Sequence, residues 1–339
     1  MKKKTLKLIS LVLAFALLAA FSACGSSGSD SAASEAPSSA AAGKTFNIGV
    51  VQLVEHPALD AATQGFSDKL TSLMEADGNT VNIDVQNAQG ESSNCAVIVN
   101  GYVSKNVDLI MANATAALQA AQTGTSTIPI LGTSVTDYAT ALDIDNWSGT
   151  TGINVSGTSD LAPLDQQADI IKELFPDAKN VGLLYCVAEP NSKYQVDLVR
   201  GYLEDMGYTC TDFTFADSNE AASVTQSACS ASDVIYIPTD NTAASCAETI
   251  RGVAEPAGVP IVAGEENLCK GCGVATLSIS YYSLGEKTAE MAYDILVNGA
   301  DPSTMEIQYA EAFTKEYNAE LAEALGVTIP DGYEPIAEG

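Results

Sequence analysis

Short β-branched runs alternate with longer amphipathic segments along most of this chain. Such alternation is typical of βαβ units, and it restricts the fold to parallel strands covered by helices. The predicted strands are 47–52, 80–86, 107–112 and 128–131 in the first half, and 180–185, 208–215, 233–237 and 259–262 in the second. The predicted helices are 58–74, 93–104, 114–123, 161–175, 192–206, 219–229 and 242–254.

The two halves also resemble each other in sequence. Ile48-Gly49-Val50-Val51 matches Val181-Gly182-Leu183-Leu184, and Ile128-Pro129-Ile130-Leu131 matches Val259-Pro260-Ile261-Val262, at nearly the same offset. Chance similarity among α/β units is the alternative. The repetition predicts an α/β fold of two doubly wound parallel-sheet lobes joined by a hinge.

The lobe boundaries follow from these strands. We expect an N-terminal lobe of residues 45–155 plus 280–310 and a C-terminal lobe of residues 156–279. The chain is predicted to cross between lobes within 152–159 and 276–282. The tail, 311–339, could pack on either lobe.

The N-terminus indicates export. A charged start, MKKKTLK, precedes an apolar run, Leu8–Phe21, that is too short to span a bilayer comfortably, so residues 1–23 are predicted to be a signal peptide. The small residues before Cys24 resemble a lipoprotein processing site; an ordinary secretory signal is the alternative. Residues 24–44, rich in Ser, Ala and Gly, predict a flexible tether. We therefore expect a lipid on Cys24 that holds the protein on the extracytoplasmic face of the cell membrane.

The charge balance excludes one class of partner. The sequence has 15 Lys+Arg against 43 Asp+Glu, a net charge of −28. Loss of Lys2, Lys3, Lys4 and Lys7 with the signal leaves 11 cations, so the processed chain carries 11 − 43 = −32. Such a field repels nucleic acid, which is not expected as a partner. The sequence offers no obvious oligomerisation segment, and a monomer is the expectation.

Eight cysteines leave seven after Cys24, an odd number. Cys269 and Cys272 have a suggestive spacing, but they lack the context of a redox motif and the second pair of a zinc site. A local disulfide or two idle thiols is favoured over a metal. No metal and no cofactor is predicted.

Two facing lobes would place function in the cleft between them. Ligands of open parallel sheets bind beyond the carboxyl ends of the strands, and a hinge can close two lobes over a ligand. The candidate ligand-binding residues in the loops at those ends are Glu55, His56, Thr115, Ser134, Val135, Thr136, Asp137, Ser159, Asp160, Glu189, Asn191, Ser192, Thr239, Asp240, Asn241, Glu265 and Tyr281.

The charges of these loops indicate a ligand class. Acidic residues predominate, and the nearby cations are Lys193 and Lys270, so a strongly anionic ligand is disfavoured. A zwitterion fits better, because its ammonium could pair with a carboxylate while its carboxylate rests on hydroxyls and helix N-termini. For each Ser, Thr or Asp, capping of the following helix is the alternative. A neutral sugar, nucleoside or other small organic solute is the second candidate ligand.

Enzymatic activity is not expected. His56 is the only histidine, and no Gly-x-Ser-x-Gly elbow or comparable nucleophile accompanies it. Paired acids alone are too common to indicate catalysis.

Several motifs resemble a known family. They are Val54-Glu55-His56-Pro57-Ala58-Leu59-Asp60 with Gly65-Phe66, Ile128-Pro129-Ile130 leading to Val135-Thr136-Asp137, Gly157-Thr158-Ser159-Asp160, Glu189-Pro190-Asn191-Ser192, and Tyr281-Tyr282 with Leu284-Gly285. Over nearly all of residues 45–330 the chain is similar to the substrate-binding lipoproteins of ABC transporters, and most closely to those for uptake of tryptophan and tyrosine or phenylalanine. The resemblance implies a periplasmic-binding-protein-like type I fold, an aromatic amino acid as ligand, and a permease with its ATPase as partner.

Overall fold

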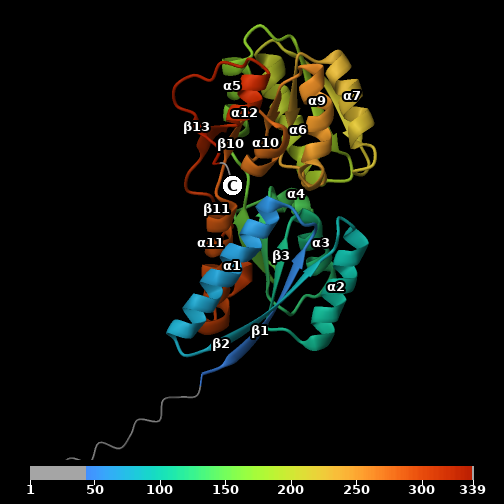
Figure 1. Ribbon diagram of the computed structural model, residues 1–339. Coiled ribbons are helices and arrows are strands. Elements are labelled where there is room, and N and C mark those ends of the chain that lie inside the picture. The colour runs from blue at the N-terminus through green and yellow to red at the C-terminus, as the bar shows by residue number, and fades with distance from the viewer. Residues whose placement is uncertain (1–42, 338–339) are drawn as a thin grey trace, which may run out of the picture. The chain divides into compact units, whose positions relative to one another are not determined.

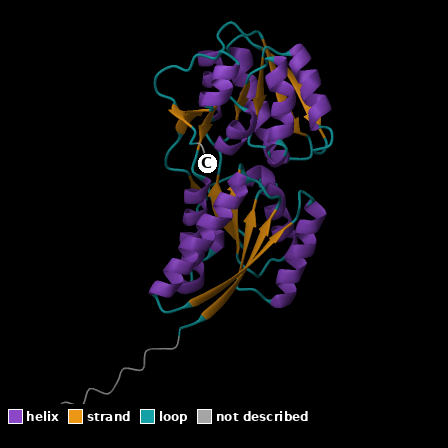
Figure 2. Ribbon diagram, viewed as in Figure 1, coloured by secondary structure: helices purple, strands orange, loops and turns teal. Residues whose placement is uncertain are grey.

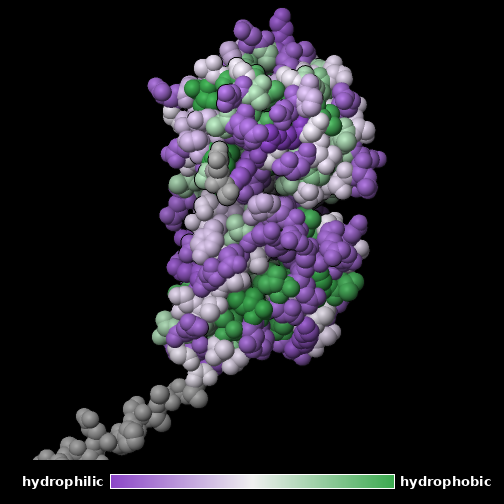
Figure 3. Space-filling model, viewed as in Figure 1, coloured by the Kyte–Doolittle hydropathy of each residue, from purple (hydrophilic) through white to green (hydrophobic). Residues whose placement is uncertain are grey.

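Two sheets of mainly parallel strands, each covered by helices, make up the computed structural model, which describes residues 43–337 (Figures 1 and 2). The predicted signal peptide, Cys24 and nearly all of the predicted tether lie outside the described residues. No helix among residues 43–337 has both the length and the apolar character needed to cross a membrane. The visible face is largely hydrophilic, in keeping with the acidic composition (Figure 3).

The first sheet has six parallel strands. Their order is β11 (Gln308–Tyr309), β5 (Val155–Ser159), β4 (Ile130–Val135), β3 (Leu109–Asn113), β1 (Thr45–Gln52) and β2 (Thr80–Asn87). The helical elements of this lobe are α1 (Pro57–Ala76), α2 (Ser92–Lys105), α3 (Thr115–Gly124), α4 (Tyr138–Leu142), α11 (Tyr281–Tyr293), η1 (Asp294–Asn298) and η2 (Pro302–Thr304).

The second sheet has seven strands. Their order is β13 (Glu334–Pro335), β12 (Thr314–Tyr317), β10 (Ala275–Ser278), β9 (Ile261–Ala263), β8 (Val234–Ile237), β6 (Asn180–Cys186) and β7 (Thr209–Phe215), and only β10 and β12 pair antiparallel. Its helices are α5 (Leu164–Leu174), α6 (Pro190–Asp205), α7 (Ala221–Ala231), α8 (Asn241–Ser245), α9 (Ala247–Ala257), α10 (Glu266–Cys272) and α12 (Ala319–Ala324).

The two sheets repeat one strand order. The series β5-β4-β3-β1-β2 of the first lobe corresponds to β10-β9-β8-β6-β7 of the second. The helices that follow the first strand of each series, α1 and α6, both have proline at their first position, Pro57 and Pro190. This arrangement confirms the predicted fold class of two doubly wound lobes.

One of the two expected passages between the lobes differs in the structure. The segment 152–159 contains the strand β5, so the chain crosses after it, at residues 160–163, whereas the segment 276–282 contains the second crossing, at residues 279–280 after β10. It crosses a third time at 310–313, between β11 and β12. The strands β12 and β13, from the tail that could not be assigned to a lobe, extend the second sheet. The helix predicted over 242–254 is two helices that meet at Cys246.

Apolar side chains fill both faces of the first sheet. Tyr102 and Leu118 lie in the core beneath α2 and α3, whereas Phe66, Leu70 and Met111 lie in the core beneath α1 and α11. Strands β3 and β4 are buried along their whole length, as expected for parallel strands covered on both sides. Both faces of the second sheet are covered in the same way.

Two glycines let α1 and α11 approach closely. A Cβ atom on Gly65 would meet the carbonyl oxygen of Tyr282, and one on Gly285 would meet the carbonyl oxygen of Ala62. Since the obstacles are backbone atoms, they cannot move aside without shifting a helix. This contact packs α1, which follows β1, against α11, which follows the second crossing. It therefore holds α11 in the first lobe.

The contact gives a stability prediction. Gly285→Ala is expected to lower the free energy of unfolding by about 1–3 kcal/mol, because the added methyl group overpacks the helix pair. The control is Gly101→Ala in α2, where nothing lies within 4 Å of the added carbon; it should raise the free energy of unfolding by about 0.5–1 kcal/mol. Urea unfolding of both variants measures this, and equal effects would contradict the account.

Candidate ligand-binding cleft

The predicted site residues lie at the carboxyl ends of strands in both sheets. Buried among them are His56, Thr115, Ser134, Val135, Thr136, Ser159, Asp160, Glu189, Asn191, Ser192, Asp240, Asn241, Glu265 and Tyr281. Asp137 and Thr239 are half-buried, and Glu55 is exposed. Val135 belongs to the apolar core of the first lobe, so only its backbone is available at the cleft. Hydrogen bonds tie the two lobes together between His56 and Asn241 and between Gln195 and Thr136.

Three of the acidic residues cap helices, as the alternative in the sequence analysis allowed. Asp137 accepts the N–H of Thr140 at 2.7 Å, and Asp240 accepts the N–H of Ala243 at 2.7 Å. Glu265 accepts the N–H of Asn267 at 2.7 Å and that of Leu268. Burial raises the pKa of Glu265 to about 7. The charges of these residues are therefore engaged by the N-termini of α4, α8 and α10.

Glu189 and Asp240 form a buried acidic pair in the second lobe. Glu189 accepts the backbone N–H groups of Asn241 at 3.1 Å and Thr242 at 2.7 Å. Asp240 also accepts the N–H of Cys186 and the hydroxyl of Ser192, each at 2.7 Å. Burial, and then the neighbouring charge of Glu189, raises the pKa of Asp240. Backbone amides thus hold both carboxylates in place.

Asp160 has a different environment. It follows β5 at the first crossing, and only 5% of its surface is exposed. Its carboxylate accepts the hydroxyl of Thr136 at 3.1 Å and the hydroxyl of Tyr281 at 2.9 Å. Burial raises the pKa of Asp160, while these two hydroxyls act to lower it. Asp160 caps no helix, and two oxygens with one hydroxyl partner each retain capacity for a further donor.

Two residues at neighbouring strand ends have strained backbones. Ala114 has φ +91° and Ser134 has φ +54°, conformations that favour glycine. Ser134 lies where the register between β4 and β5 shifts. Its buried hydroxyl oxygen has no hydrogen-bond partner among the described residues. Strain of this kind is concentrated at functional sites, and here it lies beside Thr115 at the N-terminus of α3.

His56 joins the lobes. It lies at the N-cap of α1, is 6% exposed, and its Nε2 is 3.3 Å from Oδ1 of Asn241 in the second lobe. Burial lowers the pKa of His56, so the ring is neutral at pH 7. Its Nδ1 is buried without a partner in the part of the chain that the structure describes.

Gln195 is a cleft residue that was not among the predicted site residues. This side chain, 1% exposed, donates to the carbonyl oxygen of Thr239 at 3.1 Å and to the hydroxyl of Thr136 at 3.5 Å. It also accepts the N–H of Thr239 at 3.1 Å. Gln195 shares the buried face of α6 with Val196 and Val199. The predicted site residues Asn191 and Ser192 are also buried on α6, so a further polar residue about one turn along the helix was the signal that could have revealed it.

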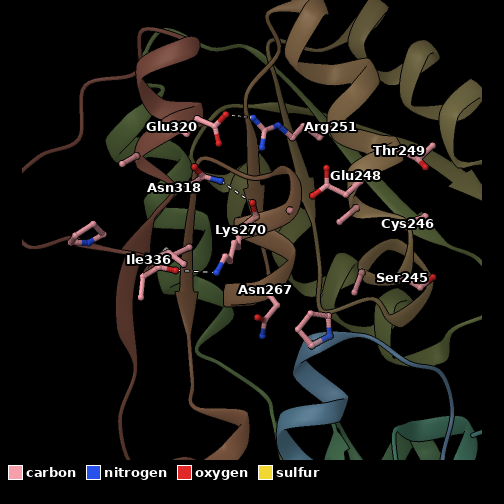
Figure 4. A pocket seen from close by; sticks show the side chains of 17 residues that line it. Ser245, Cys246, Glu248, Thr249, Arg251, Asn267, Lys270, Asn318, Glu320 and Ile336 are labelled. Atoms are coloured by element: carbon pink, nitrogen blue, oxygen red, sulfur yellow. Dashed lines mark hydrogen bonds and ion pairs between the residues drawn. The ribbon is translucent and has the colours of Figure 1, made fainter. Parts of the chain in front are cut away.

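A cavity of about 540 Å³ lies between the lobes. The first lobe contributes Leu53, Val54 and Ala116, and the second contributes Pro190. Its acidic lining residues are Glu91, Glu189 and Asp217, and no lysine or arginine lines it among residues 43–337. A larger cavity, about 710 Å³, lies mostly on the second lobe (Figure 4). There Arg251 is already paired with Glu320 at 2.7 Å and Lys270 donates to the carbonyl of Ala337 at 3.0 Å, so its cations are engaged.

The cysteines of the described chain are free thiols. Cys269 and Cys272 lie on one face of α10, buried in the core of the second lobe. Burial raises the pKa of both thiols, which keeps them protonated and unreactive. No group of three or more His, Cys, Asp or Glu residues within 43–337 is arranged to hold a metal ion.

The fold and the cleft define a two-lobed binding protein, and comparison with known families agrees. Residues 47–336 match the family model of the ABC transporter substrate binding protein, so the chain belongs to that family. The resemblance inferred from the motifs is thereby confirmed.

Individual relatives are similar over most of their length. The chain is 36% identical over 294 residues to the "Tyrosine-binding protein" of Clostridioides difficile, covering 86% of this chain and 85% of the relative. It is 32% identical to the solved ABC domain from Streptococcus pneumoniae in complex with L-Trp, with a TM-score of 0.80 over 85% of this chain and 96% of that one. A ligand-free, open substrate-binding protein with adhesive properties from Clostridium difficile is 35% identical, with a TM-score of 0.66 over 87% and 100% of the two chains. The structure is therefore more similar to the relative solved with a ligand than to the open one.

The buried acids predict how stability depends on pH. Burial raises the pKa of Glu265 to about 7 and also raises that of Asp240 in the folded state, so near neutral pH both retain protons that the unfolded chain has lost. The free energy of unfolding should therefore fall as the pH rises from 6.5 to 8, by about 1–2 kcal/mol. His56 opposes this trend only weakly, by less than about 0.5 kcal/mol, because its pKa is lowered in the folded state and the unfolded state loses its histidine proton near pH 6.5. Thermal unfolding measures the trend, and Glu265→Gln should reduce the slope. A midpoint that is constant or rises over this range would contradict the prediction.

Proposed function

We propose that this protein captures an aromatic amino acid between its lobes and delivers it to the permease and ATPase of an ABC importer. The observation that carries the proposal is the environment of Asp160, a carboxylate buried in the cleft without a cation. No catalytic role is proposed for any residue of the cleft.

The charges of the cleft favour an ammonium group. Lysine and arginine are absent from the buried residues of the described chain, whereas Asp160, Glu189, Asp240 and Glu265 are all buried. Backbone N–H groups already stabilise the last three. Asp160 is held by two hydroxyls, and a buried carboxylate with so little compensation is costly unless a cation joins it. An ammonium from the ligand would supply that cation, whereas a neutral sugar or nucleoside would not.

The spacing of the strands favours an α-amino acid. Ser134 lies near the carboxyl end of β4, Asp160 follows the neighbouring strand β5, and Thr115 follows β3 on the other side of β4. Adjacent strands lie about 4.8 Å apart, a separation suited to groups that bind the ammonium and carboxylate of one amino acid. The free hydroxyl of Ser134 and the N-terminus of α3 are suited to the carboxylate.

The cavity and the relatives support an aromatic side chain. The interlobe cavity of about 540 Å³ is within the usual range for small-molecule sites; Glu189, Asn191 and Asn241 line it, whereas Asp160 and Ser134 lie outside its lining. The name of one relative refers to tyrosine, and a solved relative is a complex with L-Trp. Together with the ammonium and carboxylate positions, these observations favour L-tyrosine or L-tryptophan over other zwitterions.

Removal of the Asp160 charge should abolish tight binding. For Asp160→Asn we expect an affinity for L-tryptophan or L-tyrosine lower by about 100-fold or more, because the ammonium loses its buried partner. Glu75→Gln, a change at an exposed acid in the last turn of α1, should bind like the wild type. Titration calorimetry with the purified protein measures both.

The absence of saturable binding of any aromatic amino acid to the wild type would refute the ligand assignment. Wild-type affinity in Asp160→Asn would refute the role of this carboxylate.

We also propose that the protein is a monomer held to the outer face of the cell membrane by a lipid on Cys24. The support is the apolar segment followed by small residues and a cysteine in the sequence. Cells fed radiolabelled palmitate should label the wild-type protein, and Cys24→Ala should remove the label and release the protein from the membrane fraction. Equal labelling of both proteins would contradict a lipid at this residue.

A further inference from the structure

Glu189 fixes the orientation of the Asn241 side chain. The amide Nδ2 of Asn241 donates to Oε2 of Glu189 at 2.7 Å, and the same carboxylate oxygen accepts the Asn241 backbone N–H at 3.1 Å. A reversed amide would place its oxygen against the carboxylate, which is repulsive. Oδ1 of Asn241 therefore faces the opposite lobe, where it lies 3.3 Å from Nε2 of His56.

This orientation selects the tautomer of His56. An amide oxygen can only accept a hydrogen bond, so Nε2 of His56 must carry the proton. The ring is neutral, because burial lowers the pKa of His56. Nδ1 is then a bare acceptor, buried and without a partner among the described residues. The next residue, Pro57, has no N–H to offer.

We propose that Nδ1 of His56 determines specificity by accepting a hydrogen bond from the ligand side chain. The phenolic hydroxyl of tyrosine and the indole N–H of tryptophan can donate this bond, and the ring of phenylalanine cannot. The inference rests on the proposed function, since it concerns the side-chain end of the same ligand. It adds a role for His56 that is separate from recognition of the amino acid backbone by Asp160.

The positions of His56 and Asn241 link ligand specificity to closure of the two lobes. His56 lies at the N-terminus of α1 in the first lobe, and Asn241 lies at the N-terminus of α8 in the second. Asn241 therefore fixes Nδ1 of His56 as a hydrogen-bond acceptor only when the two lobes are closed against each other. A ligand without a donor leaves this acceptor buried and unpaired, and the penalty should weaken its binding at least about tenfold.

Two substitutions separate the two ring nitrogens. Gln has an amide at the position of Nε2, so His56→Gln can keep the contact with Asn241 while it removes the acceptor at Nδ1. Asn has its amide nearer the position of Nδ1, so His56→Asn can keep an acceptor there while it removes the contact with Asn241. The affinities of L-tyrosine, L-tryptophan and L-phenylalanine are measured by calorimetry for the wild type and both variants.

We expect the wild type to bind tyrosine and tryptophan at least about tenfold more tightly than phenylalanine. His56→Gln should remove most of this preference with little change for phenylalanine. His56→Asn should weaken all three ligands and keep the preference. Equal wild-type affinities for the three, or an equal loss of all three in His56→Gln, would overturn the inference while leaving the proposed function intact. Failure of the wild type to bind any of them would instead overturn the proposed function, and this inference with it.

Discussion

The cleft depends on one electrostatic constraint, which is that buried carboxylates must be balanced without lysine or arginine. Glu189, Asp240 and Glu265 meet this constraint with backbone N–H groups, and each holds the start of a helix in place as it does so. Asp160 meets it with hydroxyls from Thr136 and Tyr281, which lie beside the first and second crossings between the lobes. The protein supplies little else for this carboxylate, and we propose that a positively charged ligand completes its environment.

The repeated doubly wound topology places this chemistry where two lobes can share it. Parallel strands direct all their carboxyl ends to one edge of a sheet, and the loops that carry Ser134 and Asp160 in one lobe and Asn191 and Asn241 in the other lie at such edges. The bond between His56 and Asn241 and the contacts of Gln195 then join the lobes directly. In the proposed function, ligand binding and closure of the lobes are coupled, because the same polar side chains contribute to both.

Much of this could be predicted from the sequence, since strand periodicity and the internal repeat depend on local pattern. The fold class, most strands and the loops at the strand ends follow from it. The role of each loop residue does not, because a serine or aspartate before a helix caps that helix or contacts a ligand with the same local sequence. Asp137, Asp240 and Glu265 are caps, whereas Asp160 caps no helix, and only tertiary structure separates them. The strand β5 was missed because Gly157 and short polar residues obscure its periodicity. The third crossing was missed because the strand before it, β11, has only two residues. Gln195 was missed because it lies within α6 and not in a loop at a strand end. Only the tertiary structure shows that the buried face of α6 reaches the cleft.

The most direct test of this account is a crystal structure of the protein with L-tryptophan bound. The account predicts the ammonium of the ligand within hydrogen-bond distance of Asp160, and the carboxylate at the hydroxyl of Ser134 and the N-terminus of α3. A ligand bound in the reverse orientation, or in the larger cavity beside Arg251 and Lys270, would contradict it.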